Sequence, residues 1–195
     1  VADVCDKGVG AALYMALFRS LIRATASQSF PPGTAHADIL LAAAALTNDY
    51  IARVHGRASM FATAFMGLLD PATGSLSYIN AGHDAPLIAG ADGGVRQRLG
   101  ATGPALGLLA DQRFDVGRAL LAAGDVLLGY TDGVTEATGG DGAFGESRLA
   151  QTVGAQPARS SELLLQRVEE VLDGYSRQAA AADDITMVAL RRAMP

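Results

Sequence analysis

Residues 60–81 read MFATAFMGLLDPATGSLSYINA and decide the fold class. On both sides of PATG (71–74) the sequence pattern has a period of two, and the Pro and Gly of PATG favour a turn. The stretch therefore predicts two antiparallel strands joined by a turn. A second hairpin is predicted by LIA (87–89), the turn DGG (92–94) and VRQRL (95–99).

Helical patterns flank this strand-rich region. Ala11 to Phe18 is almost uniformly apolar, which predicts a helix buried on most of its sides. A second helix is expected over residues 34–51 and a third from Ser160 or Ser161. The chain finishes DDITMVALRR (183–192), read as a strand covered on both faces. This order favours one α+β domain spanning 1–195, with sheets covered by helices, over a doubly wound fold.

Composition narrows the function classes. The 195 residues carry a formal net charge of −5 and 6% aromatic residues, without a basic stripe, which argues against nucleic-acid binding. The single cysteine, Cys5, excludes a disulfide within the chain. No signal peptide is recognisable, and no apolar run reaches the ~20 residues of a membrane span. We expect a cytoplasmic protein without membrane contact.

Carboxylates stand beside three predicted strands. Asp3 ends VAD, Asp132 ends VLLGYTD, and Asp183 and Asp184 begin the last strand. Carboxylates that converge at a sheet edge repel one another unless a cation neutralises them, and oxygen ligands suit Mg²⁺ or Mn²⁺. Two such ions about 3.5–4 Å apart can orient a hydroxide for attack on phosphorus. The alternative is that each Asp only stabilises a turn or a helix cap.

Taken together, these motifs resemble a known family. ADVCDKGVGAALYM (2–15) is similar to the signature of the SpoIIE/RsbU branch of metal-dependent type-2C protein phosphatases. FATAFMGLLDPATGSLSYINAGHDAPLI (61–88) resembles that branch's hairpin and its Asn-Ala-Gly-His element. The family's order continues in GPALGLL (103–109), GDVLLGYTDGVTEA (124–137), FGESRL (144–149) and DDITMVAL (183–190).

The resemblance implies an α-β-β-α sandwich of two mainly antiparallel sheets flanked by helices, with a site for two Mn²⁺ or Mg²⁺ ions. By position, Asp3 would bridge the ions and the carbonyl of Val4 would bind one of them. Asp132 and Asp183 match further ligands, and Asp184 would orient them from outside the ligand set. The choice between Mn²⁺ and Mg²⁺ stays open.

The resemblance also implies a function. Members remove phosphate from Ser or Thr of a protein, typically an anti-sigma-factor antagonist in bacterial partner switching. They carry a further strand before the position of Val1, so we expect this domain to lack its first strands and to follow a sensor or receiver domain in a longer protein. An open strand edge there could pair with a second copy, giving a homodimer. The alternative function is an inactive pseudophosphatase that only binds a partner.

Three other residues have two readings each. His83 could act as an acid or base, because imidazole titrates near neutrality, or it could pin a turn. Glu136 could orient a metal-bound water or simply favour the start of a helix. Lys7 could contact a phosphate or remain a solvated turn residue.

Overall fold

Two antiparallel sheets form the centre of the molecule. The computed structural model describes residues 1–28, 30–139, 142–176 and 184–194. The first sheet has the order β1-β2-β3-β6, with bounds Ala2–Val4, Ala62–Leu69, Ser75–Ala81 and Gly117–Leu120. The second has the order β10-β7-β4-β5, with bounds Met187–Arg191, Val126–Tyr130, Leu87–Ala89 and Val95–Arg98. A small β8-β9 ribbon pairs Thr138–Gly139 with Gly142–Ala143.

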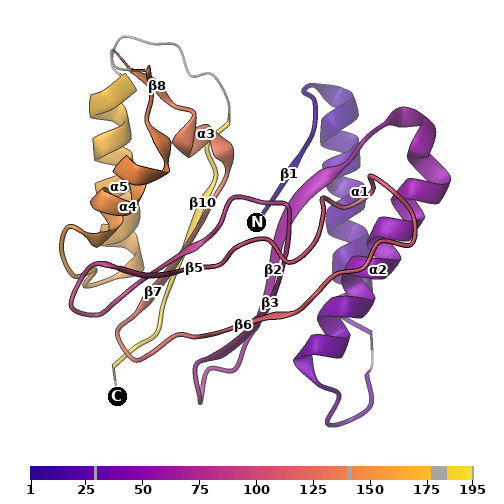
Figure 1. Cartoon of the computed structure of the whole chain (residues 1–195), viewed down its shortest axis with the longest axis horizontal. Coiled ribbons are helices and arrows are strands. Elements are labelled where there is room, and N and C mark those ends of the chain that lie inside the picture. Colours follow the sequence, from indigo (N-terminus) through magenta and orange to yellow (C-terminus); the bar gives the residue numbers. More distant parts are fainter. Residues whose placement is uncertain (29, 140–141, 177–183, 195) are drawn as a thin grey trace.

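Helices cover the outer face of each sheet (Figure 1). On the first sheet lie α1 (Val9–Ala26) and α2 (His36–His55), and α2 continues into the 3-10 turn η1 (Gly56–Ala58). On the second lie α4 (Gly145–Gly154) and α5 (Ser161–Ser176). The short α3 (Asp132–Thr135) follows β7 directly. The expected α+β architecture of the α-β-β-α type is confirmed.

Three hydrophobic clusters hold these layers together. One joins α1 and α2 to the first sheet around Phe18 and Ile79. Another joins α4 and α5 to the second sheet around Leu128 and Leu164. The third lies between the sheets, where Phe65 stacks on Tyr78 with ring centroids 5.4 Å apart. Each half therefore has a core of its own, and a smaller core joins the halves.

The hairpin predicted over residues 60–81 is present as β2 and β3. Its strands pair antiparallel from Ala64↔Ala81 to Leu69↔Leu76. The Asp70 carboxylate accepts hydrogen bonds from the Ala72 N–H (2.9 Å) and the Thr73 hydroxyl (2.8 Å), which closes the turn. The second predicted hairpin is also present as β4 and β5, with a register shift between Ile88 and Ala89.

Two predictions of burial are wrong. In α1 only Phe18 and Thr25 are buried, because this helix lies on the outside and packs on α2 and the first sheet with one face. In β10 the side chains of Val188 and Leu190 are 49% and 42% exposed. β10 is an edge strand that carries α5 on one face only, so its other face stays open.

From the sequence we expect no apolar segment long enough to cross a membrane, and helix α1 is an exception. Its 18 residues are long and apolar enough to cross a bilayer by length and composition alone. The core helix of a globular domain passes the same test. Here Tyr14, Leu17 and Phe18 pack within the cluster that joins the helix to the first sheet.

Arg192, just after β10, ties the second sheet to the first. Its guanidinium donates hydrogen bonds to the carbonyls of Ala72 (2.7 Å), Thr73 (2.9 Å) and Leu121 (2.9 Å). Gly74 leaves room for this contact, because a Cβ there would lie 2.2 Å from the Arg192 Nη1. The PATG turn is therefore held by a residue more than one hundred positions away.

Candidate active site

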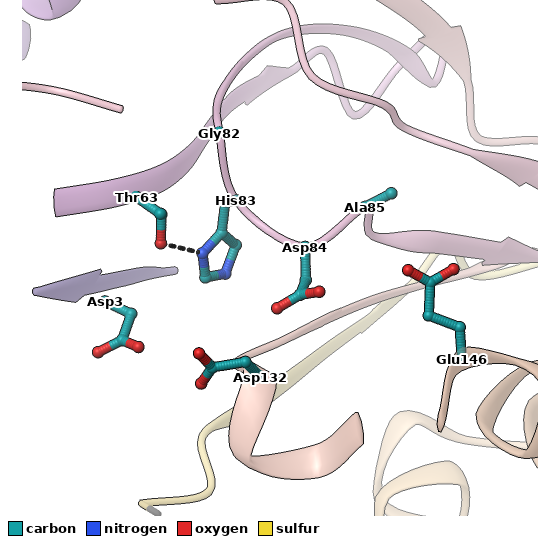
Figure 2. Close-up of a pocket in the computed structure, with 8 residues that line it drawn as sticks. All are labelled: Asp3, Thr63, Gly82, His83, Asp84, Ala85, Asp132 and Glu146. Atoms are coloured by element: carbon teal, nitrogen blue, oxygen red, sulfur yellow. Dashed lines mark hydrogen bonds between the residues drawn. The ribbon is translucent and has the colours of Figure 1, made fainter. Parts of the chain in front are cut away.

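Asp3 and Asp132 line one cavity of about 380 Å³ where the two sheets meet. Figure 2 shows the Asp132 carboxylate directed toward the side chain of Asp3, with Asp3 on β1 and Asp132 at the start of α3. The full lining consists of Asp3, Thr63, Gly82, His83, Asp84, Ala85, Asp132 and Glu146. Two of the predicted carboxylates, which lie far apart in the sequence, thus line the same cavity.

Strand pairing places Asp3. Its register partner in β2 is Thr63, and the next pair is Val4 with Ala62. Successive residues of a strand point to opposite faces, so burying Val4 (7% exposed) turns the Asp3 side chain toward the cavity. The buried apolar neighbour Val4 therefore orients the Asp3 carboxylate.

The Thr-Asp-Gly turn places Asp132. The Thr131 N–H donates to the Thr186 carbonyl (3.0 Å), and the Thr186 N–H donates to the Thr131 hydroxyl oxygen (3.0 Å). A Cβ at position 133 would lie only 2.4 Å from the carbonyl oxygen of Asp184. Only glycine allows this approach, so Gly133 brings Asp132 and Asp184 close together in the fold.

A second cavity of about 540 Å³ is lined by Asp3, Val4, Lys7 and Asp184, among other residues. Asp3 borders both cavities. Of the sequence-predicted ligands, Asp3 and Asp132 thus share one cavity, while Asp3, Val4 and Asp184 share the other. The remaining predicted ligand, Asp183, lies outside the described residues.

His83 is buried in the wall of the first cavity, with 6% of its surface exposed. The Asn80 side chain holds the turn, because its Oδ1 accepts the His83 backbone N–H (2.8 Å) and its Nδ2 donates to the Leu99 carbonyl (2.9 Å). Because Asn80 binds the backbone of His83, the imidazole ring is not needed to hold the turn. Burial lowers the pKa of His83 to about 4, so the ring is neutral at pH 7.

Asp84 and Glu146 are cavity residues that sequence reasoning missed. Burial, followed by the negative charge of Asp132, raises the pKa of Asp84 to about 6. Asp84 could have been recognised from the sequence, since it directly follows the Asn-Ala-Gly-His element. Glu146 comes from the first turn of α4 and pairs with Arg98 (2.9 Å), so only the tertiary fold brings it to the cavity.

Glu136 and Lys7 differ in their position relative to the two cavities. Glu136 is exposed just after α3, where its backbone N–H donates to the Asp132 carbonyl (2.7 Å), and it lines neither of the two cavities. Lys7 lines the second cavity, and its backbone N–H is held by the Asp6 carboxylate (2.8 Å).

The donor set fits a hard divalent cation. The charged side chains among the described residues that line the first cavity are all carboxylates, and their mutual repulsion contributes to the raised pKa of Asp84. Oxygen donors of this kind suit Mg²⁺ and Mn²⁺, which bind through few protein ligands. Within the described ranges no three acidic, histidine or cysteine side chains already stand at metal-binding spacing.

Curated relatives match nearly the whole chain. It is 40% identical over 211 residues to Protein IcfG of Synechocystis, covering 98% of this chain and 33% of IcfG. It is 25% identical over 192 residues to Phosphoserine phosphatase RsbU of Bacillus subtilis, covering 98% of this chain and 54% of RsbU. The chain thus spans a third to about half of the length of these relatives.

Solved structures agree with the fold. The RsbU and RsbW domains of Rv1364c from Mycobacterium tuberculosis match with a TM-score of 0.70 and 27% identity, covering 100% of this chain and 52% of that one. The catalytic domain of the serine threonine protein phosphatase PstP, solved with 2 manganese ions, matches with a TM-score of 0.67 and 14% identity, covering 96% and 84%. The family described as Stage II sporulation protein E matches residues 1–193, and the chain belongs to this SpoIIE family.

Proposed function

We propose that this chain is a metal-dependent phosphatase that hydrolyses phosphoserine or phosphothreonine on a regulatory protein. The observation that carries the proposal is the convergence of Asp3 and Asp132 from different sheets on one acidic cavity, in a chain of the SpoIIE family. The name of the relative RsbU, a phosphoserine phosphatase, supports the same substrate class.

Each predicted site residue has a part in this proposal. When bound, two Mn²⁺ or Mg²⁺ ions supply Lewis-acid activation of water and neutralise the phosphoryl oxygens. Asp3, which borders both cavities, would hold the ions together with the carbonyl of Val4, which lines the second cavity. Asp132 and Asp183 would be further ligands, and Asp184 would orient them. His83 acts as a neutral ring on the substrate side of the first cavity.

The physiological substrate we propose is a phosphorylated anti-sigma-factor antagonist in a cytoplasmic partner-switching pathway. We also propose that the chain forms a single catalytic domain of a longer protein with a sensor or receiver domain before it. The greater length of IcfG and RsbU supports this last point.

The test is Mn²⁺-dependent release of phosphate from an aryl phosphate and from phosphoserine and phosphothreonine peptides. Asp132→Asn is expected to lower kcat about 100-fold or more, because one cation ligand is lost. Asp173→Asn is the matched control, since this exposed aspartate lies on the outer helix α5, away from the acidic cavity. It should match the parent chain.

Calorimetric titration with Mn²⁺ separates the outcomes. Metal binding together with turnover that Asp132→Asn removes would support the phosphatase. Metal-independent binding of a partner, with no phosphate release by this chain or by its longer parent protein, would identify a pseudophosphatase instead. Full turnover by Asp132→Asn would show that the site is assigned to the wrong residues.

A further inference from the structure

The Thr63 hydroxyl contacts the imidazole of His83. The Oγ1 of Thr63 lies 2.8 Å from Nδ1 of His83, and Figure 2 draws this hydrogen bond at the edge of the cavity. Thr63 is half-buried in β2, opposite Asp3 of β1. Since the Asn80 side chain already fixes the backbone of the His83 turn, the Thr63 hydroxyl has a different effect, which is to orient the ring.

The second ring nitrogen of His83 faces the cavity. Nε2 is buried and has no hydrogen-bond partner in the described structure. Figure 2 shows it on the side of the ring toward the carboxylates of Asp84 and Asp132. The negative charge of Asp132 favours a proton on the ring. The carboxylates on the Nε2 side of the ring are hydrogen-bond acceptors.

A neutral imidazole carries its proton on one nitrogen and a lone pair on the other. A lone pair on Nε2 would face the carboxylate oxygens of Asp84 and Asp132 and be repelled by them, whereas an N–H there is attracted. With the proton on Nε2, the Nδ1 lone pair needs a donor, and the Thr63 hydroxyl supplies it at 2.8 Å. The hydrogen bond at one nitrogen thus selects the proton position at the other.

We propose that Thr63 is a positioning residue that holds His83 in its Nε2–H form, so that the ring presents a fixed N–H donor to a phosphoryl oxygen of the substrate in the cavity. The role toward substrate rests on the proposed phosphatase function. The selection of the proton position by Thr63 does not.

This arrangement suits phosphate hydrolysis. The ring is neutral at pH 7, because burial lowers its pKa to about 4, and therefore it adds no positive charge beside a cation site. A preorganised neutral donor can still bind the phosphoryl oxygens as their charge redistributes in the transition state. His83 then needs to transfer no proton.

The first test is the proton position itself, read by long-range ¹H–¹⁵N NMR on chain labelled with ¹⁵N-histidine. The signals of His83 are distinguished from those of His36 and His55 with His83→Gln. We expect Nε2 protonated and Nδ1 unprotonated in the parent chain and in Thr63→Ser, which keeps the hydroxyl. In Thr63→Val, which keeps the branched shape, the proton should be found partly or wholly on Nδ1. Nδ1 protonated in the parent chain, or an unchanged proton position in Thr63→Val, would overturn the proposal.

The second test follows a ligand. Inorganic phosphate added with Mg²⁺ should shift the His83 Nε2–H resonance in the parent chain and in Thr63→Ser, and shift it much less in Thr63→Val. No shift in the parent chain at phosphate concentrations that saturate the site would remove the donor role. Because both NMR readouts work without turnover, an inactive chain leaves this inference decidable while it counts against the phosphatase.

Kinetics provide the third test. Thr63→Val should lower kcat for an aryl phosphate about 10-fold with little change in KM, because a donor is misplaced where charge develops. Thr63→Ser should restore most of the rate. Calorimetry must give the same Mn²⁺ affinity for both variants. A weaker Mn²⁺ affinity in Thr63→Val would show that Thr63 acts through its strand neighbour Asp3 instead.

Discussion

His83 and Asp84 are neighbours whose pKa values shift in opposite directions, far enough that their order is reversed. Burial raises the pKa of Asp84 from 3.8 to about 6, and burial lowers that of His83 from 6.5 to about 4. Between pH 3.8 and about 6 the folded Asp84 holds a proton that the unfolded chain lacks. The contribution of Asp84 to stability therefore grows as pH falls through 6. The unfolded His83 holds a proton that the folded ring lacks, so its contribution shrinks as pH falls below 6.5. The two contributions oppose each other in the parent chain.

Single variants should separate these contributions in chelator-treated protein. Asp84→Asn is expected to raise the free energy of unfolding at pH 7.5 by about 1 kcal/mol, and this gain should shrink as pH falls through 6 and disappear only below about pH 4. His83→Gln should show the reverse trend, with its relative stability improving by about 2 kcal/mol between pH 7 and pH 4.5. Urea unfolding at several pH values measures both. Two curves parallel to that of the parent chain would contradict this account.

Gly133 offers a sharper prediction. In Gly133→Ala the new Cβ would meet the Asp184 carbonyl at 2.4 Å, so residue 184 must move away from the Asp132 turn. We expect a loss of about 2 kcal/mol in unfolding free energy and weaker Mn²⁺ binding by calorimetry. Gly174→Ala is the control, because a Cβ there has nothing within 4 Å, and the change should stabilise α5 by about 0.5 kcal/mol. Equal Mn²⁺ affinity in both variants would refute the prediction.

At the scale of elements, local pattern was enough wherever neighbouring residues determine the structure. The period-two stretch around PATG predicted β2 and β3, since a turn joins strands that pair with each other. The burial of α1 and β10 could not be predicted in this way. Their residues are apolar on more than one face, and the layers packed against them decide which face is covered.

The same distinction holds for the site. Asp3 and Asp132 were recognisable, because each follows an apolar strand in a familiar motif. Thr63 and Glu146 were not, because strand register brings the first beside Asp3 and the packing of α4 brings the second to the cavity. Asp84 could have been found, since it extends the Asn-Ala-Gly-His element by one carboxylate.

Substitution of Arg192 tests how much its contact with the PATG turn contributes to stability. Arg192→Lys keeps the charge but cannot donate to three carbonyls from one planar group, so we expect the protein to lose about 1–2 kcal/mol of unfolding free energy. Arg167, on α5, donates to one described carbonyl, that of Gln156, and Arg167→Lys is the matched control with little effect. Chemical denaturation of the two variants should therefore differ clearly. Similar midpoints would show that the contact of Arg192 with the PATG turn contributes little.

At the scale of the whole molecule, the exposed apolar face of the edge strand β10 predicts self-association. Val188 and Leu190 of β10 are exposed and line an apolar cavity of about 200 Å³ together with Val1 and Phe65. An exposed apolar edge can pair with a second copy. We expect the mass in sedimentation experiments to rise with protein concentration, and Val188→Lys to abolish this rise. Val171→Lys, at an exposed position of α5, is the control. A mass that stays monomeric at every concentration would exclude the homodimer.

The arrangement of the three hydrophobic clusters has a consequence for control of the site. Asp3 belongs to the half built on α1 and α2, and Asp132 to the half built on α4 and α5. A small rigid-body shift of one half against the other changes the separation of the two carboxylates while both outer cores stay intact. Cation coordination tolerates only tenths of an ångström. In the proposed cation site, a regulatory signal would therefore need no unfolding and no rearranged loop, only a change in the relative position of two preformed halves.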